Sequence, residues 1–220
     1  MKKVFNLALT IAVAAACSSA SAGVLTFEGI TPTVNGDGEI IQNGYETITT
    51  RGMGAIIDGT DPDRCDVLVC PAGSTYYAAL NDGGVSFGLS GSAFNLSGLD
   101  FAFLLPVDSR IGFSVGQLIA TGRDGTSLLS VSQDFAMQVN GKYGFAHWNF
   151  DGSTFGQSRF TEVTFSACLY TDTLACVNPA GNQAQFAIDN IAFVPEPGTM
   201  PLFGLSLLGM LAAYRRRKSA

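Results

Sequence analysis

Short apolar runs separated by glycine and other turn residues fill the chain between residues 23 and 194. The runs are rich in Val, Ile, Thr and Phe, and Gly accounts for 26 of the 220 residues, which together are typical of an all-β protein. No helical period interrupts this pattern. It predicts strands over residues 24–28, 39–49, 53–57, 76–80, 84–89, 99–105, 110–121, 128–139, 145–150, 161–170 and 185–194.

Several of these strands alternate apolar and polar residues, as expected of strands with one buried face. One apolar face would carry Leu99, Phe101, Phe103 and Leu105. Another would carry Val163, Phe165, Ala167 and Leu169, with Glu162, Thr164 and Ser166 facing the other way. With turns expected at 81–84 and 140–141, the pattern predicts an antiparallel two-sheet, jelly-roll-like β-sandwich.

The last predicted strand changes phase near its middle. Phe186 and Ile188 follow a period of two, but the next large apolar residues are Ile191 and Phe193. The slip falls at 189–190 and predicts a β-bulge, a feature that redirects side chains.

The first 22 residues have the features of a signal peptide. Lys2 and Lys3 precede an apolar stretch over 4–16, and a small-residue cleavage site occupies 20–22. We expect the exported domain to cover 23–194. Acylation of Cys17 is the alternative, although Ala14 stands where a lipoprotein signal has leucine.

The last 26 residues have the features of a targeting signal. Pro195, Glu196 and Pro197 form a stiff extended spacer before an apolar run that ends at 214, and four cations occupy 215–218. Such a run followed by cations predicts a single transmembrane helix over 199–214, whose basic end stays on the cytoplasmic side. A buried C-terminal core helix is the alternative.

These residues resemble the PEP-CTERM sorting signal of Gram-negative bacteria. Pro195, Glu196 and Pro197 match its tripeptide, and the basic end matches through Arg215, Arg216 and Arg217. The resemblance implies recognition and processing by exosortase, a membrane protease-transpeptidase. It implies an inner-membrane-anchored precursor that then reaches the cell surface or the extracellular space. The stretch 185–190 is similar to a QFxxD-type subgroup of these proteins.

The predicted domain 23–194 is strongly acidic. It has six Lys or Arg and seventeen Asp or Glu side chains, for a formal charge of −11. Such a surface repels phosphate backbones, which argues against nucleic-acid binding, and offers oxygen ligands to calcium. The alternative is that the charge serves only to keep an exported protein soluble.

Four cysteines remain in this domain. Outside the cytoplasm they are free to form disulfides, and we expect the two local pairs, Cys65 with Cys70 and Cys168 with Cys176. Zinc is the competing interpretation, but neither spacing is CxxC and the chain has one histidine.

Two acidic features are candidate calcium sites. Residues 185–190 are also similar to the closing strand of jelly-roll carbohydrate-binding modules. That resemblance implies a structural calcium on Asp189 and on Glu28, which stands where those modules have a glutamate near the first strand. The alternative is a solvated Glu28 and an Asp189 that caps the bulge. The cluster over 58–66 lacks the turn glycine and distant glutamate of an EF-hand, so we expect a solvated disulfide loop there.

The sequence gives little support for a catalytic function. His147 lies in a strand-like aromatic run, where a structural role is the usual one, and no serine has the G-x-S-x-G context. Trp148 is a candidate for stacking on a sugar ring, but core packing is the favoured interpretation of the lone Trp. We expect a non-catalytic surface or matrix protein associated with exopolysaccharide. The alternatives are a lectin-like module with structural calcium and, less favoured, a secreted glycan hydrolase.

Overall fold

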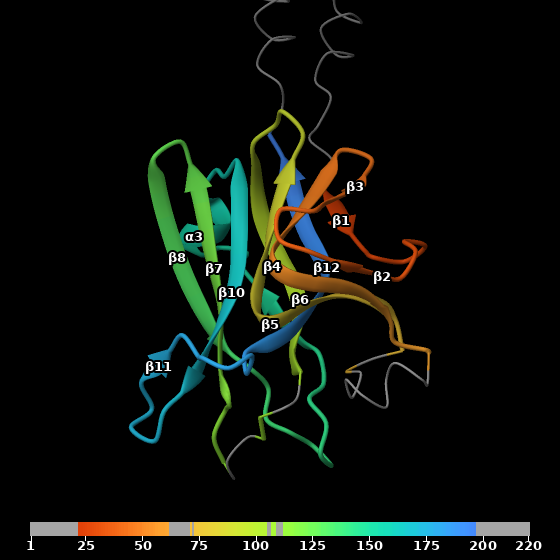
Figure 1. Cartoon of the computed structure of the whole chain (residues 1–220). Coiled ribbons are helices and arrows are strands. Elements are labelled where there is room, and N and C mark those ends of the chain that lie inside the picture. Colours follow the sequence, from red (N-terminus) through yellow and green to blue (C-terminus); the bar gives the residue numbers. More distant parts are fainter. Residues whose placement is uncertain (1–21, 62–70, 72, 105–106, 109–111, 197–220) are drawn as a thin grey trace, which may run out of the picture. The chain divides into compact units, whose positions relative to one another are not determined.

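The computed structural model of the chain describes residues 22–61, 71, 73–104, 107–108 and 112–196. The strands of this part all lie in one compact unit, Ala22–Pro195 (Figure 1). The elements are β1 (Gly23–Leu25), β2 (Thr33–Asn35), β3 (Ile40–Asn43), β4 (Glu46–Asp58), β5 (Thr75–Leu89), β6 (Phe94–Leu104), β7 (Gly116–Asp124), β8 (Ser127–Asp134), β9 (Ala146–Asn149), α3 (Thr154–Gln157), β10 (Glu162–Tyr170), β11 (Cys176–Val177) and β12 (Gln185–Pro195).

The strand β5 organises the sheet because its two halves have different neighbours. Residues 77–79 pair with β12, whereas residues 85–88 pair with β10. The strand β4 follows the other edge of β5 along its whole length. One half of the sheet therefore runs through β12, β6 and β9, and the other through β10, β7 and β8.

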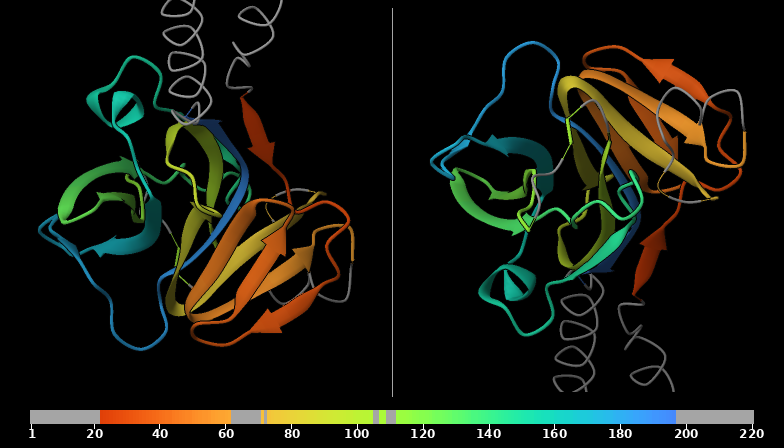
Figure 2. Two further views of the ribbon diagram at one scale, coloured as in Figure 1. Left: turned by 90° about the horizontal axis from the view of Figure 1, so that it is seen from above. Right: turned by 90° about the horizontal axis from the view of Figure 1, so that it is seen from below.

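The two halves curve toward each other around the main core, so the sheet is nearly closed (Figure 2). All the pairings between strands of the described part are antiparallel, which confirms the predicted all-β antiparallel class. The two predicted sheets are halves of a single sheet, because β4 and β5 run through both. The jelly-roll connectivity stays a prediction.

The alternation predicted for β6 and β10 is confirmed. Leu99, Phe101 and Phe103 are at most 1% exposed and belong to the main core, while Leu105 lies outside the described residues. The four apolar positions of β10 are buried in the same core, and the polar positions between them are half-buried on the outer face. Burial of these large side chains supplies the main driving force for folding.

The turn predicted at 81–84 is wrong. These residues lie inside the continuous strand β5, where Asn81 and Asp82 have φ angles of 55° and 58°. In the β4–β5 ladder Arg51 pairs with Gly84 and Met53 with Leu80, so the strands bulge there instead of ending. Asn and Asp tolerate the left-handed conformation that such a bulge needs.

The other two local predictions are confirmed. The ladder between β12 and β6 shifts register between Asp189 and Ala192, and Asn190 has a φ of 51°. At the turn 140–141, Val139 and Lys142 exchange both backbone hydrogen bonds, at 2.9 and 3.2 Å. Positive φ angles at both central residues are the signature of a tight hairpin turn.

Candidate functional site

A groove of about 730 Å³ follows the outer face of β7, β8 and β10. Its floor exists because alternate residues of these strands point away from the core. On β7 and β10, Leu118 and Phe165 are fully buried in the core, and their neighbours along the strands face outward. The outward hydroxyl and amide side chains that line the groove are Gln117, Ser130, Ser132, Thr164 and Ser166.

An ion pair occupies one end of the groove. Arg51 donates from Nε to Ser86 Oγ at 3.0 Å and from an Nη atom to Glu162 Oε1 at 3.1 Å. Burial alone would raise the pKa of Glu162. Hydrogen bonds from Ser86 and Thr164, together with the charges of Arg51 and Arg123, outweigh burial and lower that pKa. The pair thus presents little net charge to the groove.

A carboxylate at the β5 bulge holds one wall in place. Asp82 accepts hydrogen bonds from the backbone N–H groups of Asn182 and Ala184, both at 2.7 Å. These residues belong to the connection between β11 and β12, and Asn178 of the same connection lines the groove. The bulge that replaces the predicted turn therefore anchors a distant segment beside the groove.

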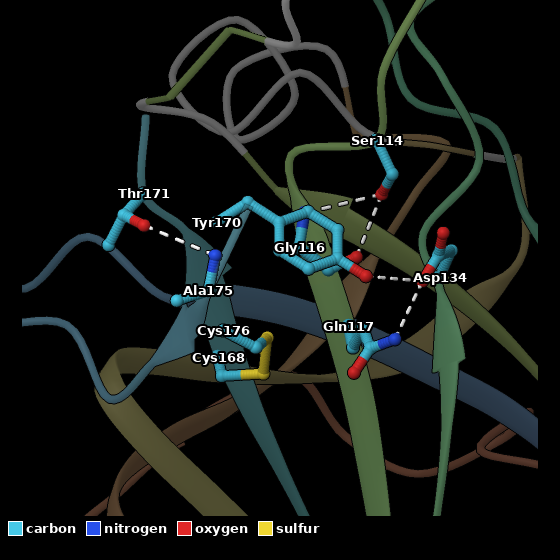
Figure 3. The surroundings of a disulfide bond; sticks show 9 residues. All are labelled: Ser114, Gly116, Gln117, Asp134, Cys168, Tyr170, Thr171, Ala175 and Cys176. Atoms are coloured by element: carbon cyan, nitrogen blue, oxygen red, sulfur yellow. Dashed lines mark hydrogen bonds between the residues drawn. A yellow bond between two sulfur atoms is a disulfide. The ribbon is translucent and has the colours of Figure 1, made fainter. Parts of the chain in front are cut away.

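The opposite end of the groove carries the disulfide between Cys168 and Cys176 (Figure 3). This bond confirms the predicted pair and ties β11 to the end of β10. The other predicted pair, Cys65 with Cys70, lies outside the described residues.

A shared carboxylate lies beside the disulfide. Asp134 Oδ1 accepts from Gln117 Nε2 at 2.8 Å and from the Tyr170 hydroxyl at 2.7 Å (Figure 3). Burial raises the pKa of Tyr170 to about 12, and the bond to the charged Asp134 adds to the effect. Asp134 thereby fixes the groove residue Gln117 against β8.

The predicted calcium residues lie near each other beside the β12 bulge. Asp189 is 4% exposed and accepts from Asn190 N at 2.8 Å and from Ser74 Oγ at 3.3 Å. Glu28 Oε1 accepts from Thr75 N at 2.9 Å. Burial raises the pKa of Asp189, and the negative charges of Asp100 and Glu28 raise it further.

Their chemistry suits a cation only in part. Carboxylate oxygens are calcium ligands, and Glu28 is close enough for its negative charge to raise the pKa of Asp189. Within the part of the chain that the structure describes, however, no group of three or more His, Cys, Asp or Glu side chains is placed to hold a metal ion. The calcium site stays a prediction. In the second acidic cluster, Asp58 accepts from the backbone and hydroxyl of Thr60, and residues 62–66 lie outside the described ranges.

The aromatic run of β9 has structural partners. His147 Nδ1 bonds Asp100 Oδ1 at 2.7 Å, and Asp100 Oδ2 accepts from Asn190 Nδ2 at 2.7 Å. Trp148 is 8% exposed, with ring centroids 5.8 Å from Phe101 and 4.6 Å from Phe150. The ring of Trp148 therefore packs in the core, as favoured from the sequence, because its position in β9 points inward, and it does not form an exposed sugar platform.

The groove was missed from the sequence, although one signal for it was present. The outward positions Thr164 and Ser166 were assigned to the solvent face of their strand. Nothing in the sequence indicated that β7, β8 and β10 would present these side chains together, because that depends on pairing between distant segments. The exposed ring of Phe113, 51% accessible, was not singled out either.

Residues 193–218 match the family described as the PEP-CTERM protein-sorting motif. The chain thus carries this motif at its C-terminus, and the motif implies export, cell-surface sorting and processing by exosortase. Pro195 ends β12, opposite Phe94 of β6. The motif from Pro197 onward, including Arg215 to Arg217 and the predicted helix 199–214, lies outside the described residues. None of the helices in the described part is long and apolar enough to cross a bilayer.

Among curated proteins, none matches this chain. Three solved structures of carbohydrate-binding modules are distantly similar. A point mutant of a family 29 module has 12% identity, covers 81% of this chain and 94% of its own, and gives a TM-score of 0.34. Another structure of a family 29 module has 12% identity, coverage of 80% and 88%, and a TM-score of 0.33. Module CBM32-3 of a family 31 glycoside hydrolase from Clostridium perfringens has 14% identity, coverage of 56% and 76%, and a TM-score of 0.32. At these values the similarities carry no argument about a ligand.

Proposed function

We propose that this protein is an exported, non-catalytic matrix protein that exosortase processes at its tail and that associates with extracellular polysaccharide. The match over residues 193–218 is the observation that carries the delivery part of this proposal. In the proposal, the signal peptide 1–22 starts export and the helix 199–214 holds the precursor in the inner membrane. We also assign the chain to the QFxxD-type subgroup, because Gln185, Phe186 and Asp189 follow that pattern.

The groove, whose lining combines hydroxyl and amide side chains with apolar ones such as Ile119, supports association with polysaccharide. Hydroxyl and amide side chains such as Ser166 and Gln117 both donate and accept hydrogen bonds, as sugar hydroxyls do. A groove open along a sheet face accommodates a polymer, whereas a closed pocket would admit only a chain end. The acidic charge of the domain disfavours nucleic acid as the polymer.

The carboxylates around the groove support a non-catalytic role. Glycoside hydrolysis needs one carboxyl group that donates a proton and a second that attacks or activates water. Asp82 uses both oxygens to accept backbone N–H groups, and Asp134 is held by Gln117 and Tyr170. These bonds use the two carboxylates to position the groove walls.

The delivery part is tested in cells by replacing Pro195, Glu196 and Pro197 with alanine. We expect the variant to keep its tail and stay with the membrane fraction at a larger apparent mass than the parent. Pro201→Ala, a proline of the same tail outside the tripeptide, is the matched control and should be processed normally. Equal size and location of the tripeptide variant and the parent would show that exosortase does not read this tail.

A second candidate function, a lectin-like module that binds one defined glycan, is favoured by the same groove. In this version calcium on Glu28 and Asp189 stiffens the fold. Saturable binding of the full chain to one polysaccharide among many would support the lectin, and weak binding to several would support the matrix protein. Release of reducing ends from any of them would make the protein a hydrolase.

A further inference from the structure

A second pocket, of about 370 Å³, is lined by residues that follow each cysteine of the disulfide, among them Leu169 and Val177. We call it the Phe113 pocket after the exposed aromatic side chain in its lining. Phe113 and Leu174 are each 51% exposed, and Val177 is 44% exposed. Large apolar side chains are usually buried, so three exposed ones around one hollow form an apolar surface that suits a ligand.

Polar groups surround this apolar surface. The amides of Asn178 and Gln183 and the carboxylate of Asp108 line the same pocket. Asp108 is held by Gln138 Nε2, which donates to Oδ1 at 2.9 Å. An open aromatic ring flanked by amides matches a pyranose, which has an apolar face of C–H groups and a rim of hydroxyls.

The backbone around Leu174 is fixed in an uncommon conformation. Leu174 has a φ of 60°, a region that costs energy for a residue with a branched side chain. The turn is held by backbone bonds between Thr171 and Ala175 at 2.9 Å and from Leu174 N to Thr171 O at 3.0 Å, and by Thr171 Oγ1, which accepts from Ala175 N at 3.2 Å. The nearby disulfide limits how far this turn can move.

The Phe113 pocket and the groove are neighbours. Asn178 lines both of them. Tyr170 lines the Phe113 pocket, Gln117 lines the groove, and both donate to the same oxygen of Asp134 (Figure 3). A polymer that leaves the groove at its disulfide end would reach the Phe113 pocket next.

We propose that the Phe113 pocket is a distal subsite for a neutral polysaccharide, in which one hexose ring stacks on Phe113 while preceding sugars occupy the groove. This inference rests on the proposed association with polysaccharide and names where and what it binds. The ligand is neutral because the carboxylates of Asp82, Asp108 and Asp134 border the surface and would repel uronic acids.

The subsite predicts a dependence on ligand length. Calorimetry on the full chain in detergent would use dimers and hexamers of β-linked glucose and of β-linked mannose, and polygalacturonate as the anionic probe. We expect Phe113→Ala to weaken binding of the hexamer about three- to tenfold, the worth of one aromatic contact, and to leave binding of the dimer unchanged. Phe113→Trp should restore hexamer binding, and polygalacturonate should not bind.

Leu128→Ala is the matched control, because Leu128 is 63% exposed and lies outside both the groove and the Phe113 pocket. Hexamer binding that survives Phe113→Ala but is lost when Ser166→Phe fills the groove would overturn the subsite and leave the proposed function standing. Failure of the parent chain to bind any neutral probe would overturn the proposed function and the subsite together. Tighter binding of polygalacturonate than of the neutral hexamers would refute the assigned ligand class.

Discussion

Tyr170 donates a 2.7 Å hydrogen bond to Asp134 at the point where the groove meets the Phe113 pocket. Burial and this bond raise the pKa of Tyr170 to about 12, above the value of about 10 for an unfolded chain. The bond therefore stabilises the fold fully below pH 10, and its contribution is lost as the pH rises toward 12.

Replacing Tyr170 with Phe removes this bond, and we expect a cost of about 1 kcal/mol at pH 7. The difference in melting temperature between the parent and Tyr170→Phe should shrink between pH 10 and pH 12, because the parent loses its advantage there. A difference that stays constant or grows over that range would contradict the role assigned to the hydroxyl.

The disulfide between Cys168 and Cys176 closes a loop with a sequence separation of 8. A loop of that length is expected to contribute about 2.5 kcal/mol by restricting the unfolded chain. Replacing both cysteines with serine should therefore lower the melting temperature by roughly 5–10 °C. Differential scanning calorimetry of the double variant, beside the parent with and without reductant, checks this. If the bond between Cys168 and Cys176 accounts for the effect of the reductant, the reduced parent should have the same melting temperature as the double variant.

Because the carboxyl of Asp189 is buried, its effect on the stability of the fold should change with pH in the opposite direction from that of an acid in a surface ion pair. Burial raises its pKa above the unfolded value, so the fold favours the protonated carboxyl and loses stability as the pH rises through the range between the two values. Asp189→Asn should therefore be more stable than the parent at pH 7, and this gain should disappear once the pH falls below the unfolded pKa of about 4. Urea unfolding at several pH values measures both.

The effect of calcium on stability distinguishes Asp189 as a calcium ligand from Asp189 as a buried carboxyl that binds no metal. If Glu28 and Asp189 bind calcium, millimolar calcium should raise the melting temperature of the parent and leave Asp189→Asn unchanged. A melting temperature of the parent that calcium and chelator do not move would remove the calcium site from the account and leave the pH behaviour as predicted.

Substitution of Trp148 tests whether its side chain belongs to the core. It is 8% exposed and packs on Phe150, so Trp148→Ala should destabilise the domain by about 3–5 kcal/mol. Phe113→Ala, at a side chain that is 51% exposed, should change the melting temperature by about 1 °C or less. Equal melting temperatures for the two variants would show that Trp148 is not a core residue.

Local patterns in the sequence predicted many of the strands and their faces, although the single strand predicted over 39–49 is a hairpin of β3 and the start of β4. The alternation around Phe101 and Phe165, the slip at Asp189 and the hairpin at 140–141 each depend on neighbours in sequence, and the structure has all of them. The stretch 81–84 failed because two residues typical of turns are also the residues that tolerate a bulge, and only pairing with β4 decides between these outcomes.

The binding surface was beyond the reach of local patterns. Gln117, Ser132 and Ser166 come from three strands, and the sequence does not say that these strands are adjacent. The lone Trp148 attracted a functional hypothesis because of its residue type, whereas exposure singles out Phe113 instead. Exposure depends on what the rest of the chain covers, which is a property of the folded domain.

The central claim is that the groove holds extracellular polysaccharide. Its most direct test is electrophoresis of the full chain in native gels that contain the exopolysaccharide of the producing cells, with Ser166→Phe filling the groove and Thr33→Phe as an exposed-strand control. We predict that the polysaccharide retards the parent and Thr33→Phe and leaves the migration of Ser166→Phe unchanged. Equal retardation of all three chains, or of none, would contradict the account.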